Sequence, residues 1–375
     1  MRWAREPAEL VQAVHELAAA PEIALDTEGD SLHHYPERLA LIQIATPGGA
    51  VWLVDPLALT NLLPLAPVFS DPARTLVLHA GDNDLVHLKR RYGLSFASVF
   101  DTAIAGRFLG GRALGLDVLL TTYLGVTLPP SRQKDDWSER PLSASQLAYA
   151  AADVQHLFAL KARMTEELAR IGRLTWVQEE CAALAVQPAP ERPIDPDAWL
   201  GVKGARDLPL RGMAVLRELW ALREQLARAA DRPPFKVLNE ETLLRVAQAL
   251  PRDSVALGVI AGITPRVLGR WGAAIIAAVE RALALEEVEL PVLSRSRRPV
   301  IPGAMSRRIE KLRRWRAATT EQIGLEPGVL LPNRLITAIA EAAPRTLDDL
   351  GRVEGVRRWR VEAFGPALLA ATTAP

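Results

Sequence analysis

The sequence predicts an α/β domain built on a mixed sheet, followed by two small all-α helical domains. Short apolar runs alternate with helical patterns in the front part of the chain and disappear after about residue 210. Two proline-rich stretches, residues 187–196 and 290–302, can continue neither a helix nor a central strand and are interpreted as linkers. We therefore expect an α/β domain at residues 1–190 and helical domains at residues 205–288 and 303–373.

The length and composition are those of a globular protein with several domains. The chain has 375 residues, of which 49% are hydrophobic and 24% are charged, so collagen-like and wholly disordered proteins are excluded. The single cysteine, Cys181, can form neither an internal disulfide nor a tetrahedral cysteine zinc site, which favours a reducing compartment.

A cytoplasmic location is expected, with no association with a membrane. Glu6, Glu9 and Glu16 interrupt a stretch that a signal peptide would keep apolar, and no apolar run approaches the length of a membrane span. The sequence indicates no obligate protein partner.

Charge is distributed unequally between the two parts of the chain. Residues 1–190 hold 16 basic and 22 acidic residues, a balance of −6, which leaves 29 basic and 22 acidic residues, or +7, for the rest. A basic carboxyl-terminal part suggests a polyanionic partner, whereas acids gathered in the front part suggest bound cations.

Four apolar runs predict strands in the front domain, at residues 23–25, 39–45, 50–54 and 75–78. The first three follow one another closely, which suggests that the sheet begins with antiparallel strands. Helical patterns dominate from about Asp84, so the sheet is expected to be mixed.

The helical part contains an internal repeat with an ungapped offset of 93 residues. Leu219 matches Leu312, Pro234 matches Pro327, and other pairs follow the same spacing, including Pro251 with Pro344, Gly262 with Gly355 and Trp271 with Phe364. Each copy is a run of helical patterns broken by Pro and Gly, which predicts two related helical domains.

The first candidate site residues follow the apolar run at 23–25. Side chains alternate between the two faces of a strand, so Asp26 and Glu28 point to the same side. The alternative is that both carboxylates belong to a solvated strand end.

A third acid, Asp84, is predicted in the first turn of the helix after residues 75–78. Acids in that position often cap a helix or compensate its dipole, and Asp82 is a competing candidate for the cap. Asp101 begins another helical pattern and is expected to cap that helix rather than to bind a ligand.

The fourth acid lies on a helix whose start is fixed by the capping-box pattern of Ser143 and Gln146. This start places Tyr149 and Asp153 four residues apart on one helical face. An ordinary hydrogen bond between the two in the protein core is the alternative to a site.

In combination, the four acids predict a metal site. Four carboxylates that meet in one place repel one another, and hard divalent cations such as Mg²⁺ or Mn²⁺ relieve the repulsion because they prefer oxygen ligands. Two such ions can activate water and stabilise the attacking and leaving oxygens at a phosphorus centre. The expected cofactors are therefore two divalent metal ions.

The motifs resemble those of the ribonuclease D family, in the tyrosine-containing branch of the four-acid 3′–5′ exonucleases. The matching segments are residues 26–28, 35–36, 39–44, 79–85, 133–142 and 149–153. The resemblance implies a ribonuclease-H-like fold for the front domain, and the two helical repeats resemble the HRDC (helicase and ribonuclease D C-terminal) domain. Gly29 and Asp135 stand where the family commonly has a bulky and a small polar residue, respectively.

By this resemblance the metal ligands are Asp26, Glu28, Asp84 and Asp153, with Asp26 between both ions, and Tyr149 orients the attacking water. The implied reaction is hydrolysis of RNA from its 3′ hydroxyl end to nucleoside 5′-monophosphates, with structured RNA such as tRNA precursors as the expected substrate. A DNA-directed 3′–5′ exonuclease is one alternative, because the acids do not read the 2′-hydroxyl. The other is a non-catalytic RNA-binding adaptor.

Two sets of basic residues are candidates for RNA contacts. Lys134 and Arg140 either contact the RNA backbone or belong to a surface loop. The second set is basic and lies in the two helical repeats. In the second repeat it comprises Arg307, Arg308, Lys311, Arg313, Arg314 and Arg316 along one helical pattern, with Arg357, Arg358 and Arg360 further on, and in the first repeat Arg266 and Arg270. A solvated helical face is the alternative for these arginines. Trp315 and Trp359 are expected in the core rather than stacked on bases.

Overall fold

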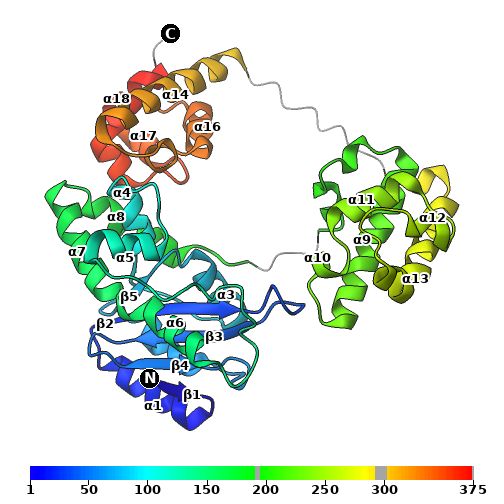
Figure 1. Cartoon of the computed structure of the whole chain (residues 1–375). Helices are drawn as coiled ribbons and strands as arrows, with labels where there is room; N and C mark the ends of the chain where they lie inside the picture. Colours follow the sequence, from blue (N-terminus) through cyan, green and yellow to red (C-terminus); the bar gives the residue numbers. More distant parts are fainter. Residues whose placement is uncertain (191–194, 292–301, 374–375) are drawn as a thin grey trace. The chain divides into compact units, whose positions relative to one another are not determined.

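In the computed structural model, which describes residues 1–190, 195–291 and 302–373, a six-stranded sheet forms the centre of the front domain (Figure 1). The strands are ordered β1-β4-β3-β2-β5-β6. Their bounds are β1 (Arg2–Ala4), β2 (Glu22–Gly29), β3 (Leu39–Ala45), β4 (Val51–Val54), β5 (Thr75–Leu78) and β6 (Val99–Asp101).

The sheet is mixed, as the sequence predicts. Strand β3 pairs antiparallel with β4, whereas β1 pairs parallel with β4, and β5 pairs parallel with both β2 and β6. All four predicted strands are present. Strands β1 and β6 are not predicted, because a run of three residues is too short for its apolar period to be recognised.

Helices pack on both faces of this sheet. Leu10 and Leu17 of α1 share one core with Ile42 of β3, whereas Val154 of α6 shares a second core with Leu41 of the same strand. The helices are α1 (Pro7–Ala18), α2 (Ala66–Phe69), α3 (Asp82–Tyr92), α4 (Thr102–Phe108), α5 (Leu116–Leu124), α6 (Ala144–Gln155), α7 (Leu157–Arg170) and α8 (Leu174–Val186), with a 3₁₀ turn at Leu63–Leu65.

The helical part shows the repeat that the sequence predicts. In the first copy the helices are α9 (Leu210–Ala230), α10 (Pro234–Val237), α11 (Glu240–Ala249), α12 (Ser254–Gly258) and α13 (Pro265–Ala284), with 3₁₀ turns at Ala198–Gly201, Ala205–Asp207 and Glu287–Glu289. In the second copy they are α14 (Gly303–Ile323), α15 (Pro327–Leu330), α16 (Asn333–Ala342), α17 (Leu347–Gly351) and α18 (Arg358–Thr373). Each helix of the second copy begins 93 residues after its counterpart. Residues 191–194 and 292–301, in the two expected linkers, lie outside the described residues.

The three expected domains form two compact units. Residues 1–28, 39–190 and 299–375 make one unit, so the second helical domain packs with the front domain. Residues 29–38 and 191–298, which contain the first helical domain, make the other. In this second unit the loop at 29–38 contacts α9 and its end: Tyr35 donates a hydrogen bond to Glu224, and Nδ1 of His34 lies 2.7 Å from Asp231.

An aromatic cluster joins the second helical domain to the front domain. Trp359 of α18 is 2% exposed, and its ring stacks on that of Trp176 in α8 with 4.6 Å between centroids. Phe108 of α4 meets Trp359 edge to face at 5.4 Å, and Phe364 meets Trp176 in the same way at 5.7 Å. Figure 1 shows α17 and α18 beside α4 and α8. Trp359 is therefore a core residue, as expected.

Two acids of α8 complete this interface. Glu179 accepts hydrogen bonds from the backbone N–H groups of Arg358 and Trp359, at 2.6 and 2.9 Å. Glu180 accepts from the Trp359 indole at 3.0 Å and from the Arg360 guanidinium at 2.6 Å. Arg357 also pairs with Glu180, at 3.3 Å. Arg357 and Arg360 thus bind the front domain of the same chain, which corrects their interpretation as RNA contacts.

No helix among the described residues is long and apolar enough to cross a membrane.

Candidate active site

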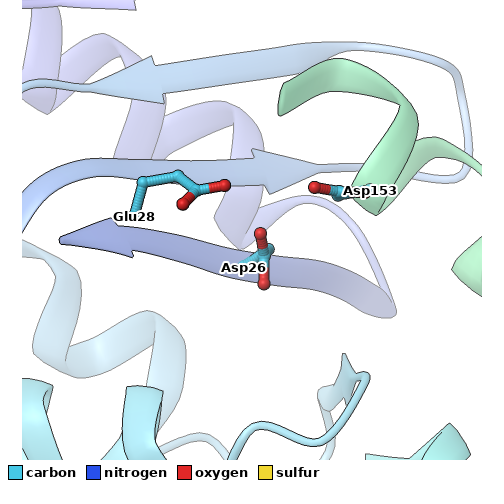
Figure 2. Close-up of side chains that lie close together, drawn as sticks. All are labelled: Asp26, Glu28 and Asp153. Atoms are coloured by element: carbon cyan, nitrogen blue, oxygen red, sulfur yellow. The ribbon is translucent and has the colours of Figure 1, made fainter. Parts of the chain in front are cut away.

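Three carboxylates converge at the centre of the sheet. Asp26 and Glu28 lie two residues apart on β2, and Asp153 lies on α6. One ligand oxygen from each of the three lies within 4.8 Å of the others. Figure 2 shows the carboxylates turned toward one another. The strand alternation expected for Asp26 and Glu28 is present, and the solvated alternative does not apply because Glu28 is buried.

Asp84 joins this cluster from the first turn of α3. Thr27, between the two acids of β2, donates a hydrogen bond from its hydroxyl to Asp84. The helix cap is Gly81 rather than Asp82, and no side chain caps the helix. Asp84 lines the same cavity as Asp26, Glu28 and Asp153. The structure therefore brings together all four acids that the sequence predicts.

Asp101 fixes the turn that leads to Asp84. Its carboxylate accepts from the N–H groups of Ala103 and Ile104, so it caps α4 as predicted. It also accepts from the N–H groups of Ala80 and Gly81, at 3.2 and 2.9 Å, directly before α3. Asp101 is thus a positioning residue and not a member of the acidic cluster.

Helix α6 presents Tyr149 and Asp153 to the cluster. Ser143 and Gln146 form the predicted capping box, which sets the register of the helix. The Tyr149 ring packs against Trp137 at 6.0 Å between centroids, and Tyr149 is among the groups that influence the pKa of Asp153. Both residues line the cavity beside the acidic cluster, which places the pair at the site rather than in an ordinary part of the core.

The electrostatics of the cluster reflect four acids held close together out of water. Burial raises the pKa of Asp26 well above its usual value, and Asp84 and Glu28 raise it further. Burial, followed by Asp153, Asp84 and Asp135, raises the pKa of Glu28 to about 9. Burial raises the pKa of Asp153 to about 7 and also raises the pKa of Asp84. The charged forms of these groups are costly unless a cation lies among them.

The donor set fits a hard divalent cation. Every ligand atom offered by Asp26, Glu28 and Asp153 is a carboxylate oxygen, and neither a histidine nor the buried Cys181 belongs to the cluster. Oxygen-only sites suit Mg²⁺ or Mn²⁺ rather than softer metals. Asp84 can supply a fourth carboxylate from the opposite side of Thr27.

The stability of the metal-free protein should fall as pH rises. The folded state keeps Glu28 protonated up to about pH 9, whereas the unfolded chain loses that proton near pH 4.5. Folding is therefore favoured at low pH, and this contribution is lost as pH rises through the folded-state pKa. Metal binding displaces the same protons, so the increase in melting temperature caused by Mg²⁺ should grow with pH. Thermal melts between about pH 5 and pH 9, with chelator or Mg²⁺, measure both trends.

The Glu28→Gln variant is the control for this pH dependence, since other groups also titrate. The difference in melting temperature between the metal-free parent and Glu28→Gln should grow with pH, because only the parent must ionise a buried acid at this position. A difference that stays constant over this range would contradict the raised pKa of Glu28.

The four acids and Tyr149 line a cavity of about 1010 Å³. The lining also includes residues that carry no recognisable motif, at 114–118, 121–122 and 127–131. Gly115 is the N-cap of α5 and Pro129-Pro130 follow that helix, so loop punctuation is the only signal in the sequence for these residues. His79 also lines the cavity, and its Nδ1 lies 2.9 Å from the Thr102 hydroxyl.

Arg140 is fully engaged by the protein. Its guanidinium pairs with Asp55 at 2.7 Å and donates to the carbonyl oxygens of Trp137, Glu139 and Ala40, at 2.7, 2.9 and 2.8 Å. These contacts favour a structural role for Arg140, and its contact with the RNA backbone remains a prediction. Lys134 is exposed in the same loop.

The basic residues of α14 differ in their surroundings. Arg308 donates from Nε to the Ala340 carbonyl at 2.6 Å, and Arg314 lies 3.3 Å from Glu310 on the same exposed face. Arg307 is exposed, whereas Lys311 is half-buried. An RNA contact for these residues remains a prediction.

Family models match three parts of the chain. Residues 1–169 match the model described as 3′–5′ exonuclease, and residues 212–279 and 305–372 each match the model of the HRDC domain. The chain is 33% identical over 379 residues to ribonuclease D of Pseudomonas paraeruginosa, with 98% of this chain and 96% of that protein covered. It is 35% identical over 291 residues to ribonuclease D of Escherichia coli, with 76% and 74% covered.

Solved structures show the same likeness. The crystal structure of Escherichia coli RNase D, described as an exoribonuclease involved in structured RNA processing, has a TM-score of 0.69 at 28% identity and covers 98% of this chain and 97% of its own. The catalytic core of RRP6 from Trypanosoma brucei has a TM-score of 0.68 at 26% identity and covers 76% and 80%.

Proposed function

The chain belongs to the ribonuclease D family, and on that premise we propose that Asp26, Glu28, Asp84 and Asp153 hold the cations of its reaction. The protein is a hydrolytic 3′–5′ exoribonuclease. The observation that carries the proposal is the convergence of carboxylates from β2 and α6 within 4.8 Å, in a cavity that Asp84 also lines.

The cluster would hold two divalent cations, Mg²⁺ or Mn²⁺, with Asp26 between them. When bound, such ions activate water and stabilise the attacking and leaving oxygens of an in-line displacement at phosphorus. Asp26 is central to the cluster, because the three other acids each contribute to raising the pKa of its carboxyl. This central position supports a bridging role. Carboxylates that bind cations are deprotonated, so the four acids would not act as proton donors in the reaction.

Tyr149 would orient the attacking water. Burial, with the charges of Asp153 and Glu28, raises the pKa of Tyr149, and a phenol is protonated near pH 7 even at its usual pKa. A protonated phenol cannot act as a base, but its hydroxyl can hold a water in line with the scissile phosphate. Tyr149 lines the same cavity as Asp153, four residues away on α6, which places its hydroxyl beside the cluster.

The Tyr149→Phe variant should lower kcat by about ten- to hundredfold, the effect of one lost hydrogen bond of 1–3 kcal/mol in a buried site. The ring of phenylalanine keeps the contact with Trp137, and all four acids remain. The increase in melting temperature on addition of Mg²⁺ should therefore be retained. Turnover on a 3′-labelled RNA gives kcat, and the melts give the control. If the variant lost the increase in melting temperature with Mg²⁺, Tyr149 would be needed for metal binding by the acids rather than for orienting the attacking water.

The expected substrate is structured RNA with a single-stranded 3′ end, such as a tRNA precursor. A cavity of about 1010 Å³ can accept the nucleotides at a strand end but not a folded duplex. The test is incubation with RNAs that end in a 3′-hydroxyl or a 3′-phosphate, with Mg²⁺ or chelator, beside a DNA of the same sequence. Stepwise shortening of RNA from the free hydroxyl end, abolished by chelator, is the expected result. Equal shortening of DNA would favour a DNA-directed enzyme.

A further inference from the structure

The two helical domains use the same face of the repeat in different ways. In the second domain this face packs against the front domain: Leu325 and Val329 belong to the joint core, and so do Trp359 and Phe364. Backbone N–H groups of this face also bind the front domain, because Glu179 accepts hydrogen bonds from those at the start of α18. The face is therefore an interface within the chain.

In the first domain the equivalent positions, 93 residues earlier, are occupied by basic residues. Arg232 stands where the second domain has Leu325, Lys236 where it has Val329, and Arg266 where it has Trp359. One aromatic position is kept, because Trp271 corresponds to Phe364. A face that is apolar and covered in one copy is thus basic in the other.

These residues surround a groove, which we call the basic groove. It has a volume of about 310 Å³, and its lining includes Arg232, Phe235, Lys236, Arg266, Arg270 and Trp271. None of the described residues that line it is acidic. The charge of the four cations is therefore not neutralised within the groove, which favours an anionic ligand.

The cations are exposed rather than held by the protein. In the described part of the chain, no salt bridge or side-chain hydrogen bond engages Arg232, Lys236 or Arg266, and all three are exposed. The Arg270 guanidinium lies 5.1 Å from the centroid of the Trp271 ring. By contrast, Arg245 of the same domain, outside the groove, pairs with Glu241.

The groove also presents aromatic surface. Phe235 is 52% exposed, although it lies between buried neighbours at Pro233 and Val237. Trp271 lines the same groove and is half-buried. Exposed rings beside cations are the combination that proteins use to bind single-stranded nucleic acid, because bases stack on the rings while the cations hold the phosphates.

We propose that the basic groove binds the RNA substrate, with Lys236, Arg266 and Arg270 on backbone phosphates and Phe235 stacked on a base. The inference rests on the exoribonuclease function given above, and it assigns an RNA site to the first helical domain. In the second domain the equivalent face is not available to RNA, because it packs against the front domain.

The test uses the full-length protein in chelator, where RNA is bound without being cleaved. The groove variant, Lys236→Ala/Arg266→Ala/Arg270→Ala, is compared with a control variant that removes the same charges elsewhere in the domain, Lys203→Ala/Arg206→Ala/Arg252→Ala. All six side chains are exposed, so neither variant should change the melting temperature. A labelled structured RNA with a single-stranded tail reports affinity at several salt concentrations.

We expect the groove variant to bind the RNA at least about tenfold more weakly and to reduce the slope of log affinity against log salt by about two, since each lost phosphate contact removes about 0.7. The control variant should stay within about twofold of the parent, as expected for charges that touch no phosphate. The single variant Phe235→Ala should weaken binding about five- to hundredfold without changing the slope, because stacking releases no counterions.

Two outcomes would overturn the proposal. If the groove variant binds RNA as the parent does, the groove serves another acidic ligand, such as a protein. If the control variant weakens binding as much as the groove variant does, only net charge matters. Hydrolysis of a dinucleotide, whose single internucleotide phosphate cannot occupy the active site and the groove at once, separates this proposal from the proposed function. The parent must cleave it for the function to stand, and the groove variant should then cleave it at the parent's rate.

Discussion

The Asp26→Asn variant loses at least about 10³-fold in turnover, because Asp26 lies at the centre of the acidic cluster and its carboxylate is expected to contact both cations. A bound cation supplies several kcal/mol of transition-state stabilisation, and each 1.4 kcal/mol is worth about tenfold in rate. The loss should exceed that of Tyr149→Phe, which keeps every ligand. Single-turnover hydrolysis of a labelled RNA in saturating Mg²⁺ measures it.

The same substitution should stabilise the metal-free protein. It removes one of four acids whose burial and mutual repulsion raise the pKa of Asp26 and Glu28. In chelator the variant should therefore melt above the parent, whereas Mg²⁺ should stabilise the parent more. Loss of activity combined with a gain in metal-free stability distinguishes a broken site from a misfolded protein.

Asp117→Asn is a matched control for Asp26→Asn. Asp117 lines the same cavity, but it is exposed and lies outside the acidic cluster. Its substitution makes the same change in charge and should leave turnover close to that of the parent. If Asp26→Asn kept most of its activity, or if both variants lost activity alike, the proposed metal ligands would be wrong.

The Trp359→Ala variant should lower the free energy of unfolding by about 3–5 kcal/mol, the range for truncation of a buried aromatic residue. Trp359 is 2% exposed and contacts Trp176 and Phe108 across the interface between the second helical domain and the front domain. Its loss also leaves Glu180 without the indole hydrogen bond. Denaturant unfolding followed by circular dichroism measures the change.

The repeat provides the matched control for this substitution. Arg266 occupies the equivalent position of the first helical domain but is exposed in the basic groove, so Arg266→Ala should change the free energy of unfolding by no more than about 0.5 kcal/mol. Similar losses for both variants would show that Trp359 matters to its own domain and not to the interface. A Trp176→Ala/Trp359→Ala double-mutant cycle isolates the pair, with an expected coupling of about 0.5–1.5 kcal/mol.

Much of the site could be predicted because local signals fix the positions of its residues on their strand and helix. The capping box of Ser143 and Gln146 fixes where α6 begins, and the helical period then places Tyr149 and Asp153 on one face. Strand alternation does the same for Asp26 and Glu28 on β2. The ungapped repeat predicts two helical domains of the same build, and each helix of the second begins 93 residues after its counterpart in the first.

The features that were not predicted depend on contacts between residues far apart in the sequence. Arg140 looks like a loop cation in the sequence, and only folding brings Asp55 and the Ala40 carbonyl to its guanidinium. Arg360 looks like part of a basic helical face, and only the packing of α18 on α8 supplies Glu180 as its partner. The cavity lining at residues 114–118 carries no recognisable motif, and only folding brings these residues to the acids.

The sequence by itself determined where the acids lie on their strands and helices, and that the helical part is a repeat of one unit. Those features follow from backbone periods and caps, which act between residues a few positions apart. Only the tertiary structure decided which basic side chains bind other parts of the chain and which face a groove. The partner of a charged side chain is set by long-range packing, which the spacing of residues along the chain does not encode.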